Sequence, residues 1–389
     1  MRPRAAGALL VGVLLVACVM RSPITVVGPL VPAVSADLRL TSTAAGVLTT
    51  VPLLAFAASS AAVPRVADHL GLRRTLFAAL LLLAAGSGLR WHPSAAALFT
   101  GTALLGVAIA VVNVLLPALL RQAFPARVAL LTSGYVVVMG LAGSAASGLA
   151  VPVADGAPGG WRTALAVWAL PALLAAAVWS LQLRRPEARV PRSARARAPW
   201  RSPLAWAVTA FMGAQSVTFY VLIAWLPTVL VERSGLDEAA AGWHLSLVQG
   251  AGVLASLLVP AVATSARRAR RTGVAGSLLT GTGYALLLLA PGWTVAASVV
   301  VGAGGGITVV SALAAISSRA VDASGAAALS GMAQSVGYLL AALGPVAVGA
   351  LHAGTGSWTL PLVLMTAVGL LQAFAARAAG RDAVVLPAR

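Results

Sequence analysis

Twelve long apolar stretches run through this sequence and limit what it can fold into. A helix that crosses a membrane needs about 20 mostly apolar residues, because about 30 Å of hydrocarbon is covered at about 1.5 Å per residue. The stretches lie at residues 7–29, 43–63, 75–89, 94–120, 128–153 and 163–183, and then at 204–231, 239–264, 272–290, 293–317, 325–351 and 359–376. The sequence therefore predicts an all-α membrane protein with twelve transmembrane helices.

The composition excludes a soluble protein. Hydrophobic residues make up 60% of the chain and charged residues 9%, with a mean hydropathy of +0.94, whereas soluble domains carry about 25% charged residues. So few polar groups cannot cover a globular surface, and a soluble enzyme is excluded. The first stretch follows Arg2 and Arg4 as a signal peptide would, but it is too long and lacks a small-residue cleavage site. We therefore expect it to remain as the first span.

Charge is distributed unevenly between the two sides of the predicted membrane. All 27 basic residues are arginine, and they give a net charge of +18. With the N-terminus placed in the cytoplasm, 22 arginines fall in cytoplasmic segments, and those on the other side are Arg39, Arg90, Arg162 and Arg233. This bias predicts a cell-membrane protein with both termini cytoplasmic. Because the arginines fill gaps between apolar stretches, and do not cluster on one folded face, nucleic-acid binding is not expected.

The two halves of the chain share a pattern at a constant offset of 197 residues. At this offset Arg73-Arg74-Thr75 matches Arg270-Arg271-Thr272, and Trp161 matches Trp358. We predict an N-terminal six-helix bundle at residues 1–183, a cytoplasmic linker at 184–203, and a C-terminal six-helix bundle with a short cytoplasmic tail at 204–389. Duplication of a six-helix unit implies two pseudo-symmetric bundles and a central site that opens to each side of the membrane in turn.

The predicted loop at residues 64–74 contains Asp68, Gly71 and Arg73 at the spacing Asp-x-x-Gly-x-Arg. It resembles the signature loop of the major facilitator superfamily, Gly-x-x-x-Asp-Arg-x-Gly-Arg-Arg, and departs from that pattern at Pro64, His69 and Leu72. A carboxylate beside a helix end and an arginine cluster can hold one conformation and release it in another. We assign this role of a conformational latch to Asp68, Gly71, Arg73 and Arg74. A plain positively charged cytoplasmic loop is the alternative.

A second set of short strings extends through nearly the whole chain. They are Arg21-Ser22-Pro23-Ile24-Thr25, Gly28-Pro29-Leu30, Asn113-Val114-Leu115-Leu116-Pro117, Gln215-Ser216, Tyr220 with Trp225-Leu226-Pro227, and Gln334-Ser335-Val336-Gly337-Tyr338 with Gly344-Pro345. In their order and helix positions they resemble the cyanate and nitroimidazole transporter family of that superfamily. This resemblance implies a twelve-helix permease for small, often anionic or nitro-bearing solutes, similar to cyanate or 2-nitroimidazole.

Arg21 is the one arginine that falls deep inside a predicted span, about 14 residues and roughly 20 Å along the first helix. A central arginine costs about 2.5 to 3.5 kcal/mol even on the lenient insertion scale. All nine acids fall in loops or at span ends. The guanidinium fork suits planar oxygens, so we expect Arg21 to bind an anionic group of the solute. Alternatively, it is structural and bonds backbone carbonyls near the kinks at Pro23, Pro29 and Pro32, or it reaches the outer interface.

Other polar residues within the spans complete the predicted solute site. Thr218 occupies the position that repeats Arg21, and Gln334 and Tyr338 share one helix face four residues apart. The predicted solute-binding residues are Arg21, Thr25, Asn113, Gln215, Thr218, Tyr220, Gln334 and Tyr338. Each one alone is equally well interpreted as a hydrogen-bonding group between helices.

Two further patterns have simpler interpretations. The glycines at residues 302–306 lack the lysine of a phosphate loop and favour close helix packing. Trp91, Trp161, Trp293 and Trp358 fall at outer span ends and are typical of an aromatic belt.

Together these features predict a secondary active transporter that works by alternating access, binds a small-molecule solute and the lipid bilayer, and is a monomer. A multidrug or other small-solute efflux permease is the alternative, with an intramembrane enzyme or a non-transporting sensor more distant. Neither cofactor nor metal is expected, since Cys18 is the single cysteine and the four histidines lack partners at metal-ligand spacing. The energy source stays open between a coupling proton and an exchanged anion, because no acid lies within a span.

Overall fold

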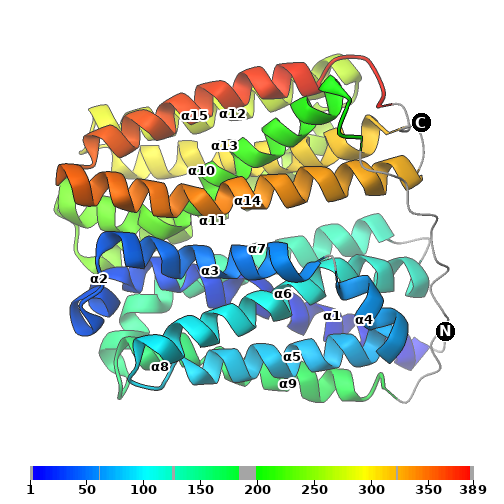
Figure 1. The fold of residues 1–389 in the computed structure, drawn as a ribbon, viewed down its shortest axis with the longest axis horizontal. Helices are drawn as coiled ribbons and strands as arrows, with labels where there is room; N and C mark the ends of the chain where they lie inside the picture. Colours follow the sequence, from blue (N-terminus) through cyan, green and yellow to red (C-terminus); the bar gives the residue numbers. More distant parts are fainter. Residues whose placement is uncertain (1–2, 61, 125–127, 184–198, 321–322, 386–389) are drawn as a thin grey trace. The chain divides into compact units, whose positions relative to one another are not determined.

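A computed structural model of the chain describes residues 3–60, 62–124, 128–183, 199–320 and 323–385, which are almost entirely helical (Figure 1). The first half forms α1 (Pro3–Thr25), α2 (Val27–Leu38), α3 (Ser42–Ser60), α4 (Val63–Leu70), α5 (Leu72–Leu89), α6 (Ala95–Ala123), α7 (Val128–Gly156), α8 (Trp161–Ala166) and α9 (Ala169–Ser180). The second half forms α10 (Pro203–Ser234), α11 (Glu238–Val262), α12 (Ala266–Leu289), α13 (Thr294–Ser318), α14 (Ala323–Thr355) and α15 (Thr359–Ala379).

The helices account for the predicted membrane spans. In the described part of the chain, 11 segments are long and apolar enough to cross a membrane, and the bent pair α1 and α2 brings the number to 12. One of the 11, Trp161–Ser180, is made of α8 and α9 together. The prediction of an all-α protein with twelve spans is confirmed.

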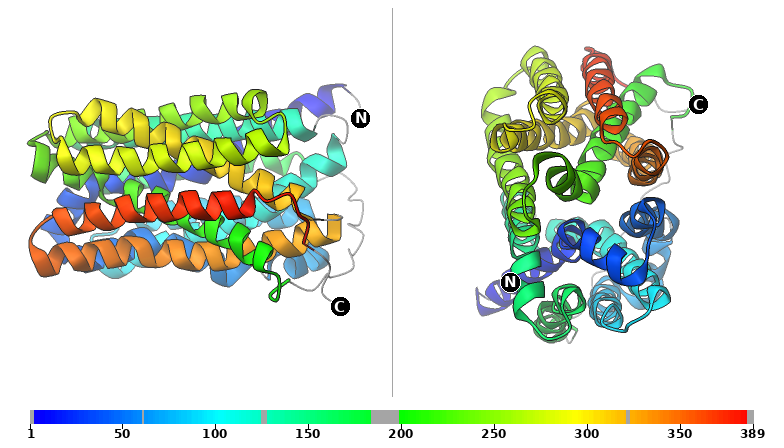
Figure 2. Two further views of the ribbon diagram at one scale, coloured as in Figure 1. Left: turned by 90° about the horizontal axis from the view of Figure 1, so that it is seen from above. Right: turned by 90° about the vertical axis from the view of Figure 1, so that its left-hand side faces the viewer.

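The chain divides into two compact units, each seen end-on in the right-hand view of Figure 2. Unit 1 comprises residues 1–40 and 51–191, and unit 2 comprises residues 41–50 and 192–389. The first half of α3 groups with unit 2, where the Thr50 hydroxyl donates to the carbonyl of Ala342 at 2.8 Å. Residues 184–198 of the predicted linker lie outside the described residues.

The repeat at 197 residues extends to the helices themselves. Shifted by this offset, α7 (Val128–Gly156) falls on residues 325–353, inside α14 (Ala323–Thr355). In the same way α3 (Ser42–Ser60) falls on residues 239–257, inside α11 (Glu238–Val262). The first and sixth spans differ between the halves, because they are broken in unit 1 and are the continuous helices α10 and α15 in unit 2.

Prolines account for both breaks in unit 1. Pro29 is the third residue of α2 and Pro171 is the third residue of α9. In a first helical turn the missing N–H of proline is tolerated, but its ring clashes with the carbonyl four residues earlier and prevents the preceding helix from continuing. The first span therefore bends by 43° between α1 and α2. A bend there is predicted from the prolines, whereas the break between α8 and α9 is not.

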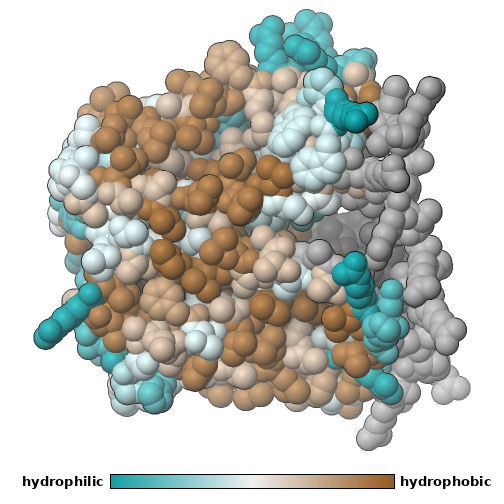
Figure 3. Space-filling view, in the orientation of Figure 1, coloured by the Kyte–Doolittle hydropathy of each residue, from teal (hydrophilic) through white to brown (hydrophobic). Residues whose placement is uncertain are grey.

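Apolar side chains pack inside each unit and also cover its outside. Leu76, Leu80 and Leu116 are fully buried in the core of unit 1, while Leu170 of that unit is 65% exposed and Phe374 of unit 2 is 72% exposed. Figure 3 shows apolar residues over the middle of the helices and hydrophilic ones toward the helix ends. This distribution is the one that a hydrocarbon solvent favours.

The tryptophans correct one expectation. Trp91 and Trp293 are exposed, as residues of an aromatic belt are, but Trp161 and Trp358 are buried. The indole N–H of Trp358 donates to a carboxylate oxygen of Glu232 at 2.8 Å, and its ring stacks on His352 with centroids 4.0 Å apart. The prediction of an interfacial role is therefore wrong for these two, because each packs within its own unit.

Candidate functional site

Arg21 lies in the last two turns of α1, four residues before that helix ends at Thr25. Its side chain is half-buried. The bend between α1 and α2 follows within five residues, so Arg21 is placed where the first span changes direction. A guanidinium held at the end of a helix inside a bundle is suited to recognise planar oxygen groups.

Thr25 faces α7 within unit 1. Its hydroxyl is fully buried and donates to the carbonyl of Gly143 at 3.0 Å. The hydroxyl of Ser147 in turn donates to the carbonyl of Thr25 at 3.3 Å, which the proline at position 29 cannot bond. The structure thus places Thr25 in a helix-to-helix contact. Asn113, the other predicted residue of this unit, is exposed on α6.

In unit 2, Gln215 and Thr218 are buried among α10, α12 and α15. The Thr218 hydroxyl donates to the Gln215 carbonyl at 2.9 Å and lies 3.5 Å from the side-chain oxygen of Gln372. The Tyr284 hydroxyl donates to the carbonyl of Thr218 at 2.6 Å. Gln372 and Tyr284 also belong to this polar cluster, although neither is among the predicted residues. Their polar side chains within the predicted spans 359–376 and 272–290 are the signal that identifies them.

The remaining predicted residues of unit 2 come together on α10 and α14. The rings of Tyr220 and Tyr338 meet edge to face with centroids 6.4 Å apart, and Phe219 packs against Tyr220 at 5.2 Å. Gln334, one turn before Tyr338, donates from its amide to the Ser330 hydroxyl at 2.7 Å. Both tyrosines are half-buried. This aromatic group, with Gln334 beside it, could stack on a flat solute.

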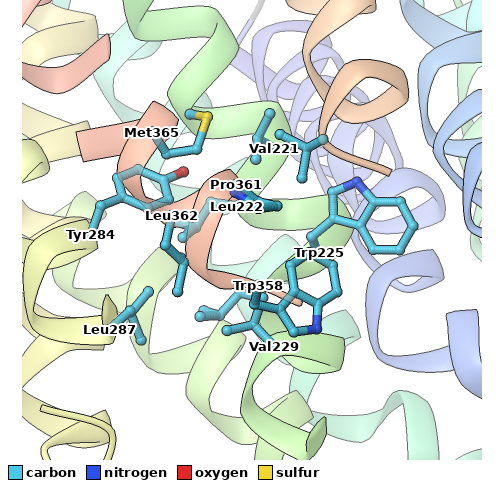
Figure 4. Close-up of a pocket in the computed structure, with 12 residues that line it drawn as sticks. Val221, Leu222, Trp225, Val229, Tyr284, Leu287, Trp358, Pro361, Leu362 and Met365 are labelled. Atoms are coloured by element: carbon cyan, nitrogen blue, oxygen red, sulfur yellow. The ribbon is translucent and has the colours of Figure 1, made fainter. Parts of the chain in front are cut away.

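An apolar cavity lies between α10, α12, α14 and α15 of unit 2 (Figure 4). It is lined mainly by aliphatic side chains together with Trp225, Trp358 and Tyr284. The indole N–H groups of Trp225 and Trp358 are bonded to the Pro345 carbonyl and to Glu232, and the Tyr284 hydroxyl is bonded to the Thr218 carbonyl. Because its polar groups are already bonded, this cavity offers nothing to balance the charge of an anion.

The predicted latch residues surround the junction of α4 and α5. Gly71 separates the two helices with φ +89°, a conformation that favours glycine, and its carbonyl accepts from the Thr75 hydroxyl at 2.8 Å. Asp68 and Arg74 are exposed, and the backbone carbonyl of Arg73 accepts from the Trp179 indole at 3.1 Å. The junction is therefore fixed to α9 by its backbone, with the Asp68 carboxylate on its surface.

Within the described ranges, no three His, Cys, Asp or Glu side chains come close enough to hold a metal ion.

Comparison with known proteins defines the class first. The model of the Major Facilitator Superfamily matches residues 13–345. Among solved structures, the D-xylose-proton symporter has a TM-score of 0.76 at 15% identity and covers 94% of this chain and 96% of its own. The nucleoside transporter NupG has a TM-score of 0.77 at 13% identity, and the match covers 95% of this chain and 99% of NupG.

Relatives with higher sequence identity identify the family within this superfamily. The 2-nitroimidazole transporter of Escherichia coli is 41% identical over 377 residues, which cover 96% of this chain and 95% of its own. The cyanate transport protein CynX of Escherichia coli is 28% identical over 248 residues, covering 63% and 64%. The chain belongs to the Major Facilitator Superfamily and, within it, to the family of these nitroimidazole and cyanate transporters. It is a small-solute transporter and a multi-pass membrane protein.

Proposed function

We propose that this protein carries a small anionic or nitro-bearing solute, of the size of cyanate or a 2-nitroimidazole, across the cell membrane by alternating access. The observation that carries the proposal is the relationship to the 2-nitroimidazole transporter, which extends over 96% of the chain. A nitro group and a small anion such as cyanate both present a planar or linear group with exposed hydrogen-bond acceptors. One arginine can serve either kind.

Arg21 is the residue we assign to the solute. It lies inside the first span, in a helix that bends within five residues of it. In unit 2, Tyr220 and Tyr338 provide aromatic faces on α10 and α14, and Gln334 provides an amide. The Arg21 guanidinium suits the acceptor atoms of a nitro group or a small anion. Within unit 2, the two tyrosine rings suit the flat face of an aromatic solute.

Several finer properties belong to the same proposal. Repetition of one six-helix unit supports two halves that move as bodies, and the arginine distribution supports cytoplasmic termini in the cell membrane. We propose transport without enzymatic chemistry, because the relatives at 41% and 28% identity are transporters. We propose a monomer with no nucleic-acid partner, driven by a coupling proton or an exchanged anion. Efflux of other small or drug-like solutes is the second candidate, since the cavity of unit 2 has an apolar lining, which favours neutral over charged groups.

Flux into proteoliposomes tests the proposal. Purified protein in vesicles should accelerate entry of labelled 2-nitroimidazole or of nitrite at least about tenfold over protein-free vesicles, with saturation in the micromolar to millimolar range typical of such sites. Heat-denatured protein incorporated in the same way is the control. Saturable flux of hydrophobic cations with none of nitroheterocycles or anions would favour the efflux alternative.

Asp68→Asn tests the latch. If the Asp68 carboxylate stabilises one conformation, its loss should slow the maximal transport rate several-fold while solute affinity stays within about twofold, because Asp68 is not one of the residues assigned to the solute. Initial rates across a range of solute concentrations separate the two quantities. Asp37→Asn, which removes an exposed carboxylate paired with Arg162 at 2.6 Å, is the matched control. Equal loss of rate and affinity in Asp68→Asn would contradict the latch.

A further inference from the structure

A buried arginine at the end of α5 joins the two broken spans of unit 1. Arg90 directly follows Leu89, the last residue of α5, and its side chain is 0% exposed. One terminal nitrogen donates to the carbonyl of Pro23 at 2.9 Å, and the other donates to the carbonyl of Leu165 at 2.8 Å. The sequence places this residue in the connection after the third predicted span, and the structure adds that its side chain is buried.

Both acceptor carbonyls lie at helix C-termini. α1 ends at Thr25 and α8 ends at Ala166, so Pro23 and Leu165 each belong to the last four residues of a helix, whose carbonyls lack a partner within that helix. A helix C-terminus carries a partial charge of roughly −0.5. The carbonyls of these two ends therefore place partial negative charge against the Arg90 guanidinium, which they hold by direct hydrogen bonds. Among the described residues, no acid lies within ion-pair distance of Arg90.

The repeat supplies an internal control for this interpretation. The positions of unit 2 that correspond to Arg90, Pro29 and Pro171 are Leu287, Leu226 and Val368. There the first and sixth spans are the unbroken helices α10 and α15. The arginine thus occurs in the half that has two helix breaks and is replaced by leucine in the half that has none. Gly101 leaves room for the Arg90 side chain, because a Cβ at position 101 would come within 2.9 Å of the Arg90 Cγ.

We infer that Arg90 is a positioning residue for solute recognition, which holds the last turn of α1 against α8 and thereby fixes the direction in which Arg21 is presented. Pro23 and Arg21 lie in the same last turns of α1, two residues apart. A displacement of the Pro23 carbonyl therefore moves the backbone that carries Arg21. The functional half of this inference rests on the proposed function, whereas the clamp on α1 does not.

The test compares Arg90→Met, which keeps the length of the side chain but not its donors, with Arg90→Lys, which keeps the charge but not the fork. Two quantities are measured on purified protein. The first is the rate at which a maleimide labels Cys18, the single cysteine, three residues before Arg21 on the same helix. The second is the transport KM and maximal rate for nitrite and 2-nitroimidazole in proteoliposomes.

For Arg90→Met we expect the Cys18 labelling rate to change at least about threefold and KM to rise about tenfold, with a smaller change in maximal rate. Arg90→Lys should show the same changes at reduced size. Arg233→Met is the matched control, since Arg233 donates to the Leu288 carbonyl at 2.5 Å in unit 2, and it should leave Cys18 labelling unchanged.

The two readouts separate the possible failures. If neither wild type nor variant transports these solutes, a changed Cys18 rate still supports the clamp while the proposed function fails. If Cys18 labelling and KM in Arg90→Met both equal those of wild type, the inference is overturned. Should Arg90→Met not accumulate as folded protein, Arg90→Lys carries the same test, and wild-type values in that variant together with an unchanged melting temperature overturn it.

Discussion

Replacing Arg21 by methionine is expected to lower the initial rate of solute uptake by about tenfold to a hundredfold at subsaturating concentration. A hydrogen bond to a charged group contributes about 1.5 to 3 kcal/mol, and about 1.4 kcal/mol corresponds to a factor of ten in affinity. Methionine preserves the length and apolar volume of the stem and removes the charge and all five donors. The loss should fall on KM if Arg21 binds the solute equally in all states, and on the maximal rate as well if the contact strengthens during transport.

Two companion variants give this result its meaning. Arg21→Lys should retain part of the uptake, because the charge remains while the bidentate fork is lost. Arg39→Met, an exposed arginine of the same unit, should transport as wild type does. Uptake that is unchanged in Arg21→Met, with normal amounts of protein in the membrane, would remove Arg21 from the solute site and leave it a structural residue.

Enlarging Gly306 is expected to have the largest effect on stability. A Cβ at this position of α13 would lie 1.9 Å from the carbonyl oxygen of Gly252 on α11, and one at Gly302 would lie 2.2 Å from the carbonyl of Val248. These helices therefore touch backbone to backbone, and Gly306→Val must separate them. Overpacking of this kind costs about 1 to 3 kcal/mol or more. Thermal unfolding in detergent should show a melting temperature lower by several degrees.

The same glycine string provides the control. Gly305 precedes Gly306 on the same helix, and a Cβ added to Gly305 would meet nothing within 4 Å. The melting temperature of Gly305→Val should therefore lie within about 1 °C of those of Gly305→Ala and of wild type. The comparison is matched because Gly305 and Gly306 are neighbours on the same helix. Equal destabilisation by valine at 305 and 306 would mean that helix propensity, and not packing, sets the effect.

The sequence predicts the spans well because length and hydropathy are local properties. The structure departs from the prediction where contacts between distant residues determine the conformation. Residues 163–183 look like one uninterrupted span, yet Pro171 divides it into α8 and α9. Counting arginines by loop predicts a side of the membrane but not burial within the protein, so it does not reveal that the Arg90 side chain is fully buried. The sequence position of Arg90 does not indicate that its guanidinium bonds the distant carbonyls of Pro23 and Leu165.

The candidate site shows the same division between local and long-range information. Spacing along one helix correctly places Gln334 and Tyr338 on a shared face, where Tyr338 meets Tyr220. Spacing does not identify which backbone carbonyls the Thr25 and Thr218 hydroxyls bond. A buried hydroxyl group donates a hydrogen bond to a carbonyl that lies close to it. Its partner therefore depends on helix packing, which cannot be inferred from the local sequence.

Chemical restoration of charge at position 21 tests the central claim most directly. In a Cys18→Ser background, which removes the single native cysteine, Arg21→Cys is reconstituted and treated with a methanethiosulfonate that attaches either an ammonium or a neutral methyl group. The account predicts that uptake of nitrite and 2-nitroimidazole is lost in Arg21→Cys, recovers severalfold with the cationic reagent, and stays low with the neutral one. Equal uptake after both reagents, or uptake that never depended on residue 21, would contradict it.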